Sequence, residues 1–226
     1  MPGLPLAVRG LQLSFDAVSV IALDALDVAP GSFIALSGPS GSGKSTLLYL
    51  LSGLLHPDAG QVAWGQTDLS SLRESARDRW RRDNAGFIFQ DFHLIAEMSP
   101  LNNVLAPALF GHFSSRPFRD AARDRLQMLG VPLERRRASL LSRGEQQRVA
   151  MARALLFNPP VVFADEPTAS LDAPTGRDVV AVLRRLATQE RRTVIAASHD
   201  PALLDQADLI IRLDHGRPVD TGLTPT

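Results

Sequence analysis

The residues best suited to chemistry form one short segment near position 40. Within it, Gly38, Gly43, Lys44 and Ser45 match the phosphate-loop pattern G-x-x-x-x-G-K-[ST]. Glycines let the backbone curl until successive N–H groups point at one anion, and the N-terminus of a following helix points at the same place. A lysine ammonium there can reach phosphate oxygens, and a serine hydroxyl suits Mg²⁺. We therefore predict that the whole segment binds nucleotide phosphates: Gly38, Pro39, Ser40, Gly41, Ser42, Gly43, Lys44, Ser45 and Thr46.

The flanking sequence favours this interpretation over a Gly/Ser-rich turn that matches by chance. Residues 32–36 form an apolar run typical of a buried strand, and residues 47–51 read as the start of a helix that ends near Gly53. Lysine and arginine together number 24, and Lys44 is the only lysine among them. A compact, rotatable ammonium thus stands where a planar guanidinium would be too bulky.

Two adjacent carboxylates, Asp165 and Glu166, follow a second apolar run at residues 161–164. The carboxyl ends of strands are where ligands bind in open α/β sheets. One carboxylate can hold a Mg²⁺ ion that bridges phosphates, and its neighbour can orient or deprotonate an attacking water. Capping of the next turn would explain the pair if it stood alone, but beside a phosphate loop it predicts a catalytic site.

A third polar group, Ser142 and Gly144, lies at the start of a predicted helix. A hydroxyl and an unhindered amide at a helix N-terminus can bind an anion. An ordinary serine N-cap explains the same residues equally well, and the residues alone leave both interpretations open.

The elements that position these groups alternate between strands and helices. Alternation at residues 6–15 and 18–28 predicts antiparallel strands, and buried or edge strands are predicted at 61–65, 85–90, 161–164, 193–197 and 209–213. Helices are predicted at 70–82 with Ser70 or Ser71 as cap, and at 103–110, 119–129, 144–157 and 178–187, while the tail after Gly216 is predicted to be loose. This order predicts an α/β fold with a mainly parallel sheet. We expect a single domain over residues 1–226, with a core of 1–90 and 158–226 and a helical subdomain at about 91–157.

Composition narrows the functional classes. Acidic and basic residues balance at 24 each, so we expect no nucleic acid as partner. The absence of cysteine excludes disulfides, thiolate metal sites and cysteine nucleophiles. Neither a signal peptide nor an apolar stretch of membrane-spanning length is recognised, and a cytoplasmic location is expected.

The order of the motifs resembles the ATP-binding-cassette (ABC) ATPases over residues 15–216. The phosphate loop, Gln90, Leu-Ser-Arg-Gly-Glu-Gln-Gln-Arg at 141–148, Ala-Asp-Glu-Pro-Thr at 164–168 and Ser-His-Asp at 198–200 occur in the order and approximate spacing of that family. The resemblance implies a P-loop NTPase core with an N-terminal antiparallel β subdomain and an inserted α-helical subdomain. It also implies ATP hydrolysis with ATP and Mg²⁺ as cofactors.

Carried over to this chain, the resemblance implies catalytic roles for Glu166, His199 and Gln90. Glu166 would be the general base for the attacking water, and His199 would touch the γ-phosphate. Gln90 would reach the metal and the water and signal to a membrane partner. Ser45, Gln90 and Asp165 would form the protein's part of the metal site.

The resemblance also implies residues that act on adenine and across a dimer. Phe15 would stack on adenine, although a residue of the strand core is the alternative. Ser142, Gly144 and Glu145 would contact the nucleotide held by the other subunit, and residues 170–172 would cross the interface. We call residues 141–148 the signature, and two of its residues depart from the family's usual sequence. Arg143 replaces a glycine, so its side chain points away or meets phosphate. Glu145 stands where glutamine is commoner.

Residues 85–94 and 164–172 look most like the lipoprotein-release and macrolide-export (LolD/MacB-type) branch. This branch implies a homodimer or heterodimer of ATPase subunits on an integral membrane permease, placed at the inner face of the cell membrane. The apolar, proline-broken stretch at 92–110 would receive the permease. Two alternatives remain: a cell-division type ATPase that transmits force to a membrane protein without transport, and a soluble ABC ATPase without a membrane partner.

Overall fold

The centre of the molecule is a six-stranded sheet, and the phosphate loop and the pair Asp165–Glu166 stand at the carboxyl ends of two of its strands. The computed structural model describes residues 2–16, 18–111, 115–133 and 137–223. The order is β10 (Arg217–Leu223), β9 (Leu209–Asp214), β3 (Phe33–Ser37), β8 (Thr193–Ala197), β7 (Val161–Asp165) and β6 (Ala85–Ile88). All neighbours pair in parallel except β10 with β9. The predicted α/β fold with a mainly parallel sheet is confirmed.

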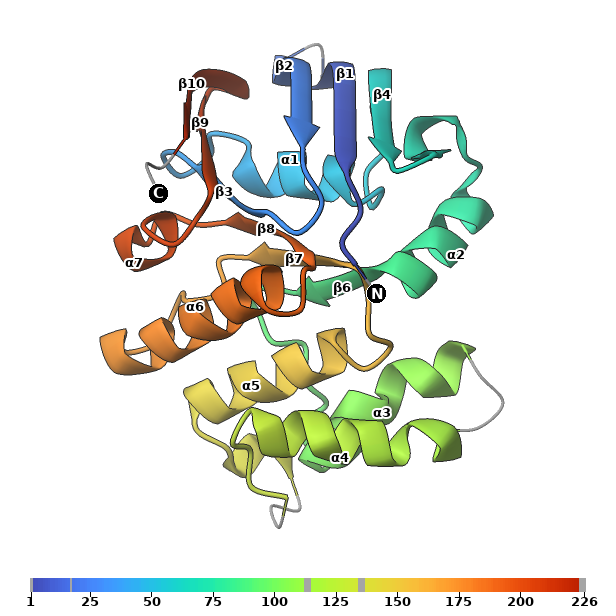
Figure 1. Cartoon of the computed structure of the whole chain (residues 1–226), viewed down its shortest axis with the longest axis vertical. Helices are drawn as coiled ribbons and strands as arrows, with labels where there is room; N and C mark the ends of the chain where they lie inside the picture. The colour runs from blue at the N-terminus through green and yellow to red at the C-terminus, as the bar shows by residue number, and fades with distance from the viewer. Residues whose placement is uncertain (1, 17, 112–114, 134–136, 224–226) are drawn as a thin grey trace.

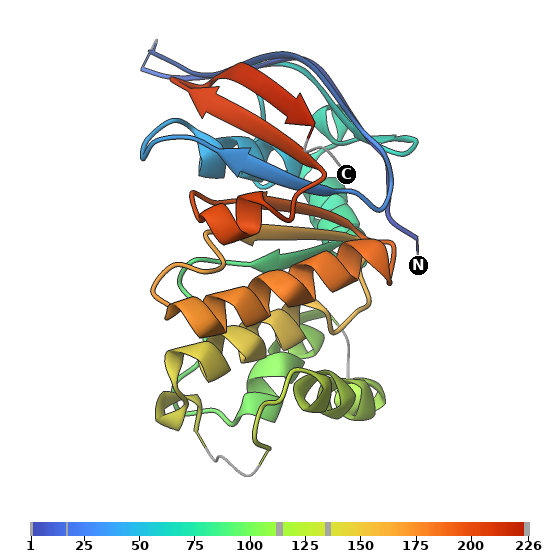
Figure 2. The same cartoon turned by 60° about the vertical axis from the view of Figure 1, so that its left-hand side comes forward.

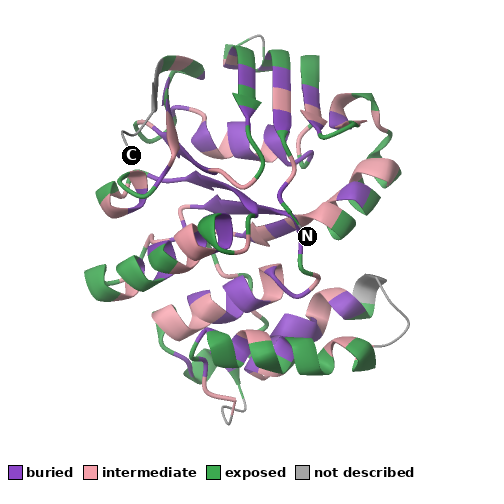
Figure 3. Ribbon diagram, in the orientation of Figure 1, coloured by how far each residue is buried: buried purple, intermediate pink, exposed green. Residues whose placement is uncertain are grey.

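Both faces of this sheet are buried, which explains why its strands are apolar throughout. Along β3, Phe33 and Ala35 pack into one hydrophobic cluster, and Ile34 packs into another on the opposite face. The same alternation holds along β7 and β8. Successive side chains of a strand point to opposite faces, so a strand covered on both sides needs apolar residues at every position. Figure 3 shows the buried layer running through the middle of the molecule.

A second sheet covers one face, at the top of Figure 1. It is antiparallel, in the order β2 (Val18–Val28), β1 (Leu6–Phe15), β4 (Ala59–Trp64) and β5 (Thr67–Asp68). Helix α1 (Lys44–Leu51) lies between the two sheets, and α2 (Glu74–Asn84) lies to one side. This arrangement confirms the predicted N-terminal antiparallel subdomain.

Helices cover the other face (Figures 1 and 2). Helix α6 (Ala173–Thr188) lies against the sheet, and α3 (Pro100–Gly111), α4 (Arg119–Met128) and α5 (Arg143–Ala154) pack on one another beyond it. The hydrophobic cluster on this face is continuous from the strands into all four helices. Short helical segments complete the chain: α7 (Pro201–Leu204) and 3-10 turns at Leu69–Ser71, Arg116–Phe118 and Ala138–Leu140. Within the described residues, no helix combines the length and apolar character needed to cross a membrane.

Several sequence predictions are wrong. The helix predicted at 178–187 begins five residues earlier, at Ala173, where Asp172 accepts a hydrogen bond from Thr175 N. The helix predicted at 70–82 begins later, at Glu74, because Ser70 belongs to a separate turn. Asp68 Oδ1 accepts a hydrogen bond from Ser70 N, and Ser70 Oγ accepts one from Val62 N of β4. The tail after Gly216 is not loose up to Leu223, because β10 pairs with β9; residues 224–226 lie outside the described chain.

Candidate functional site

The phosphate loop joins the end of β3 to the start of α1, and it needs glycine at two points. Gly43 immediately precedes the helix with φ 97°, in the left-handed region that glycine adopts readily. At Gly38, with φ 145°, a Cβ atom would stand 2.2 Å from the carbonyl oxygen of Leu213. The first amides of α1 have no intrahelical acceptor and carry the positive end of the helix dipole. The loop is therefore built to receive an anion.

Lys44 is positioned over this loop by the backbone. Its side chain is 8% exposed, and Nζ donates hydrogen bonds to the carbonyl oxygens of Gly38 and Pro39, both at 2.9 Å. The ammonium is thus held beside the loop, where it can supply a full positive charge to a bound phosphate.

Three side chains meet beneath the loop. Ser45 Oγ and Tyr49 Oη donate to the two oxygens of Asp165, Oδ1 and Oδ2, each at 2.8 Å. Asp165 is the last residue of β7 and is 5% exposed. Burial, the hydrogen bond to Asp165 and the charge of that carboxylate raise the pKa of Tyr49 to about 12. The Tyr49 hydroxyl is therefore a hydrogen-bond donor throughout the neutral pH range.

Glu166 follows in a strained conformation. Its φ is 44°, which a residue with a Cβ rarely adopts, and its N–H donates to the carbonyl oxygen of Ala197 at 2.8 Å. Its side chain is largely buried and lies 3.1 Å from His199 Nδ1, whose ring is exposed. Such a conformation costs about 1–3 kcal/mol and persists where the surroundings impose it, often at functional sites.

The predicted residues of the loop, Gln90, Glu166 and His199 surround one cavity of about 600 Å³. Its lining is Val20, Gly38, Pro39, Ser40, Gly41, Gly43, Lys44, Ser45, Thr46, Gln90, Glu166, Ala169 and His199. Ser42 lies behind this lining, and its Oγ is a buried oxygen without a partner among the described residues. The strands β3, β7 and β8 all end at this cavity, so the parallel sheet brings together motifs far apart in sequence.

The donor set fits Mg²⁺ with a nucleotide and does not fit a metal held by protein alone. Among the described residues, no group of three or more His, Cys, Asp or Glu side chains can hold a metal ion. Mg²⁺ in phosphate sites takes one or two protein oxygens and completes its shell with phosphate and water. Ser45 and Asp165 supply such oxygens beside the phosphate loop, and Gln90 opens onto the same cavity.

Phe15 is placed at the end of β1 and is 52% exposed. The alternative that it is a strand core residue is therefore wrong. An exposed aromatic face is what stacking on a base requires, although Phe15 does not line the cavity itself.

The signature residues Ser142 to Glu145 lie at the start of α5, outside the lining of the nucleotide cavity. Ser142 N-caps α5 with a complete capping box: Ser142 Oγ accepts from Glu145 N at 3.2 Å, and Glu145 Oε2 accepts from Ser142 N at 2.7 Å. Arg143 points to the loop after Gln90, with its guanidinium 5.7 Å from the centre of the Phe92 ring. No residue from 142 to 145 is among the described residues that line the nucleotide-sized cavity.

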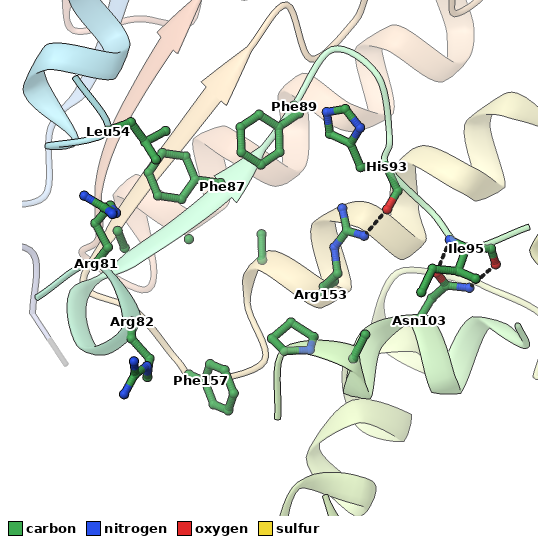
Figure 4. Close-up of a pocket in the computed structure, with 15 residues that line it drawn as sticks. Leu54, Arg81, Arg82, Phe87, Phe89, His93, Ile95, Asn103, Arg153 and Phe157 are labelled. Carbon is green, nitrogen blue, oxygen red and sulfur yellow. Dashed lines mark hydrogen bonds between the residues drawn. The ribbon is translucent and has the colours of Figure 1, made fainter. Parts of the chain in front are cut away.

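A second cavity, of about 530 Å³, is an apolar groove between α2, β6, α3 and α5 (Figure 4). Its lining is Leu54, Arg81, Arg82, Ala85, Gly86, Phe87, Phe89, His93, Ile95, Asn103, Ala106, Pro107, Arg153, Ala154 and Phe157. Arg153 donates to the carbonyl oxygens of Phe92 and His93, both at 2.6 Å, and so fixes the chain at the groove's edge. Burial lowers the pKa of Arg153 from its ordinary value. Phe89 lines the groove and Gln90 lines the first cavity, so one short segment borders both.

Sequence reasoning did not find Tyr49, nor Val20 and Ala169 of the cavity wall. A signal for Tyr49 exists: it stands one helical turn after Ser45, and side chains four residues apart share a helix face. Val20 and Ala169 carry no chemical pattern that marks them.

Comparisons with known proteins agree with this geometry. The family described as "ABC transporter" matches residues 24–169. The ABC transporter ATP-binding protein Rv0986 of Mycobacterium tuberculosis is 44% identical over 192 residues, which are 84% of this chain and 77% of that protein. The lipoprotein-releasing system ATP-binding protein LolD 2 of Rhodopirellula baltica is 38% identical over 95% of this chain and 89% of its own length. The dimeric post-hydrolysis structure of the ATP-binding cassette MJ0796 with ADP and Pi superimposes with a TM-score of 0.88 at 31% identity, over 98% of this chain and 99% of that one.

Proposed function

Because the chain belongs to the ABC transporter family and is an ABC ATPase, we propose that two copies close head to tail around two ATP molecules and drive a separate membrane permease. The observation that carries this proposal is the incompleteness of the nucleotide cavity. The phosphate loop and Glu166 line it, whereas the signature at 142–145 does not. The dimer of the relative bound to ADP and Pi supports a second copy as the source of the missing part.

The residues of the cavity divide the work of hydrolysis. The phosphate-loop amides and Lys44 bind the phosphates, and Phe15 stacks on adenine. Ser45, Asp165 and Gln90 would hold Mg²⁺, which neutralises charge on the phosphates when bound. Glu166 accepts the proton of the attacking water, and His199, 3.1 Å away, orients that carboxylate and extends to the γ-phosphate.

The signature's role across the dimer is tested at Ser142. Ser142→Asp keeps a good N-cap for α5 but brings a negative charge toward the partner's γ-phosphate. We expect single chains to bind ATP normally, whereas ATP-driven dimerisation and hydrolysis fall by at least about tenfold, since repulsion replaces a favourable contact. Analytical ultracentrifugation with Mg²⁺ and ATP measures the dimer. Ser142→Asn is the matched control, because it caps the helix without charge.

A mixture of two variants tests whether each ATP site is built from two chains or from one. Ser142→Asp retains its phosphate loop, and a Lys44→Ala chain retains its signature. A mixed dimer therefore contains one complete composite site, and we expect the mixture to hydrolyse more ATP than either variant alone. Additive activity without any gain would contradict the head-to-tail arrangement.

The apolar groove is the proposed docking site for the permease. Its lining is mostly apolar and aromatic, and Arg82 lies exposed at its border (Figure 4). These properties suit a short partner helix with an apolar face and an acidic residue. Phe89 lines the groove and the next residue, Gln90, lines the nucleotide cavity. A helix docked in the groove would therefore contact the chain right beside the nucleotide. Docking on the permease through this groove would place the subunit at the inner face of the cell membrane.

A charged residue introduced into this groove should disrupt docking of the permease without affecting catalysis. Ile95 lines the groove and is 43% exposed, so Ile95→Glu should leave the fold and the ATPase activity of the free chain unchanged. We expect it to abolish co-purification with the permease from detergent-solubilised membranes, because a carboxylate replaces an apolar contact. Leu109→Glu is the matched control, since Leu109 is 57% exposed on α3 but outside the groove. Equal retention of the permease by both variants would contradict the docking site.

Within the family, we place this subunit in the lipoprotein-release and macrolide-export branch. The similarity to LolD 2 along 95% of the chain supports that placement. The proposal is tested by reconstituting the chain with the permease that co-purifies with it and asking whether ATP releases a lipid-anchored protein from the vesicles.

A further inference from the structure

The carboxylate of Asp165 is held at both of its oxygens by one face of α1. Ser45 and Tyr49 are four residues apart on that helix and therefore lie on the same side. Ser45 Oγ donates to Oδ1 and Tyr49 Oη donates to Oδ2, at 2.8 Å each. The two bonds join the helix that follows the phosphate loop to the end of strand β7.

This pair fixes how Asp165 is presented. A carboxylate turns about its last side-chain torsion in a broad, roughly two-fold well. Donors at both oxygens remove that freedom, and the low exposure of Asp165 leaves little competition from water. The single hydroxyl proton of Ser45 is used by Oδ1, so the lone pairs of Oγ remain available to a cation.

From this geometry, and on the basis of the proposed function, we infer that Tyr49 is a positioning residue of the magnesium–nucleotide site. Its phenol holds Oδ2 of Asp165, and through Asp165 it sets the orientation of the Ser45 hydroxyl. Tyr49 itself touches neither nucleotide nor the cavity surface, since it is absent from the described residues of the lining. Such outer partners of metal ligands commonly change metal affinity by about 10- to 100-fold when they are lost.

Tyr49→Phe removes the hydroxyl and keeps the ring that packs against the hydrophobic cluster around α1. We expect the free Mg²⁺ concentration that half-saturates binding of a fluorescent ATP analogue to rise about tenfold. Binding of the same analogue in EDTA should stay within about twofold of the wild type, because the phosphate loop and Lys44 are untouched.

Ser52→Ala provides the matched control. It removes a hydrogen bond from Ser52 Oγ to the carbonyl oxygen of Tyr49, at the C-terminal end of the same helix and away from Asp165. We expect it to lower the melting temperature without changing the Mg²⁺ requirement. If Tyr49→Phe left that requirement unchanged, or if Ser52→Ala shifted it equally, Tyr49 would be a packing residue only. Failure of the wild type to bind ATP would instead overturn the proposed function.

The chain contains one tyrosine, which permits a test without any substitution that could unfold it. Growth with 3-fluorotyrosine places a single ¹⁹F reporter at Tyr49. We expect its resonance to shift when Mg²⁺ is added to the protein bound to a non-hydrolysable ATP analogue, and not when Mg²⁺ is added to the nucleotide-free protein. A resonance indifferent to Mg²⁺ in the presence of nucleotide would overturn the inference.

Discussion

Replacing Glu166 with glutamine is expected to lower the ATP hydrolysis rate by about 10²- to 10⁴-fold, the range associated with loss of a general base. Glutamine has nearly the same shape and can still hydrogen-bond to His199, which lies 3.1 Å from the carboxylate. It cannot accept the proton of the attacking water at neutral pH. Nucleotide binding should therefore persist while turnover stops, and the closed dimer should accumulate with ATP and Mg²⁺.

Release of inorganic phosphate measures the rate, and size-exclusion chromatography with light scattering measures the dimer. Glu97→Gln is the control, because Glu97 is an exposed glutamate outside the cavity. Hydrolysis at the wild-type rate by the Glu166 variant would remove this residue from the chemistry. It would also leave the strained backbone at φ 44° without a functional reason.

The sequence predicts the strand that precedes Glu166 but not the strained backbone conformation of Glu166 itself. The sequence indicates β7 because residues 161–164 are apolar at every position, and a strand buried on both faces requires that pattern. It indicates the phosphate loop because few other arrangements combine those glycines with Lys44. The positive φ of Glu166 has no sequence signal; the residue is held by a hydrogen bond from its N–H to the carbonyl oxygen of Ala197, on a strand that is distant in sequence.

Local hydrogen bonds and turn conformations explain where the predicted helices and strands differ from the structure. Serine at positions 70 and 71 suggests a helix cap, but Asp68 and Val62 bind Ser70 into the connection after β4. The final hairpin had a usable signal. His215 and Gly216 both have positive φ, at 44° and 74°, as a two-residue turn between antiparallel strands requires. The glycine at 216, after an apolar strand, is the part of this turn that the sequence shows.

The sequence indicated one part of the apolar groove, the stretch at 92–110, but not the segments that complete it. The apolar groove is lined by segments that begin at Leu54 and end at Phe157. The contact between Arg143 and Phe92 likewise joins residues whose relation appears only when α5 packs beside the loop after Gln90. The sequence alone leaves open whether the Arg143 side chain points away or meets phosphate; in the structure its guanidinium lies against the ring of Phe92.

Replacing Lys44 with alanine is expected to weaken ATP binding by about 10- to 100-fold, because a charge-assisted hydrogen bond contributes about 1.5–3 kcal/mol. Stability without nucleotide should change little. The two carbonyl oxygens that Nζ now contacts, those of Gly38 and Pro39, border an open cavity and gain water in its place. Calorimetric titration with ATP measures the affinity, and thermal unfolding measures the stability. Normal affinity in this variant would mean that the loop binds no phosphate.

Lys44→Arg decides whether charge alone is sufficient. Both carbonyl oxygens lie 2.9 Å from one nitrogen, a geometry that suits a compact ammonium and not a planar fork. We therefore expect arginine to restore little of the affinity, although 23 of the 24 basic residues of this chain are arginine. Because Lys44 is the only lysine, reductive ¹³C-methylation labels its ammonium and at most the N-terminal amine. The lysine resonance should shift on addition of ATP, which gives a direct measure of contact with phosphate that does not depend on hydrolysis.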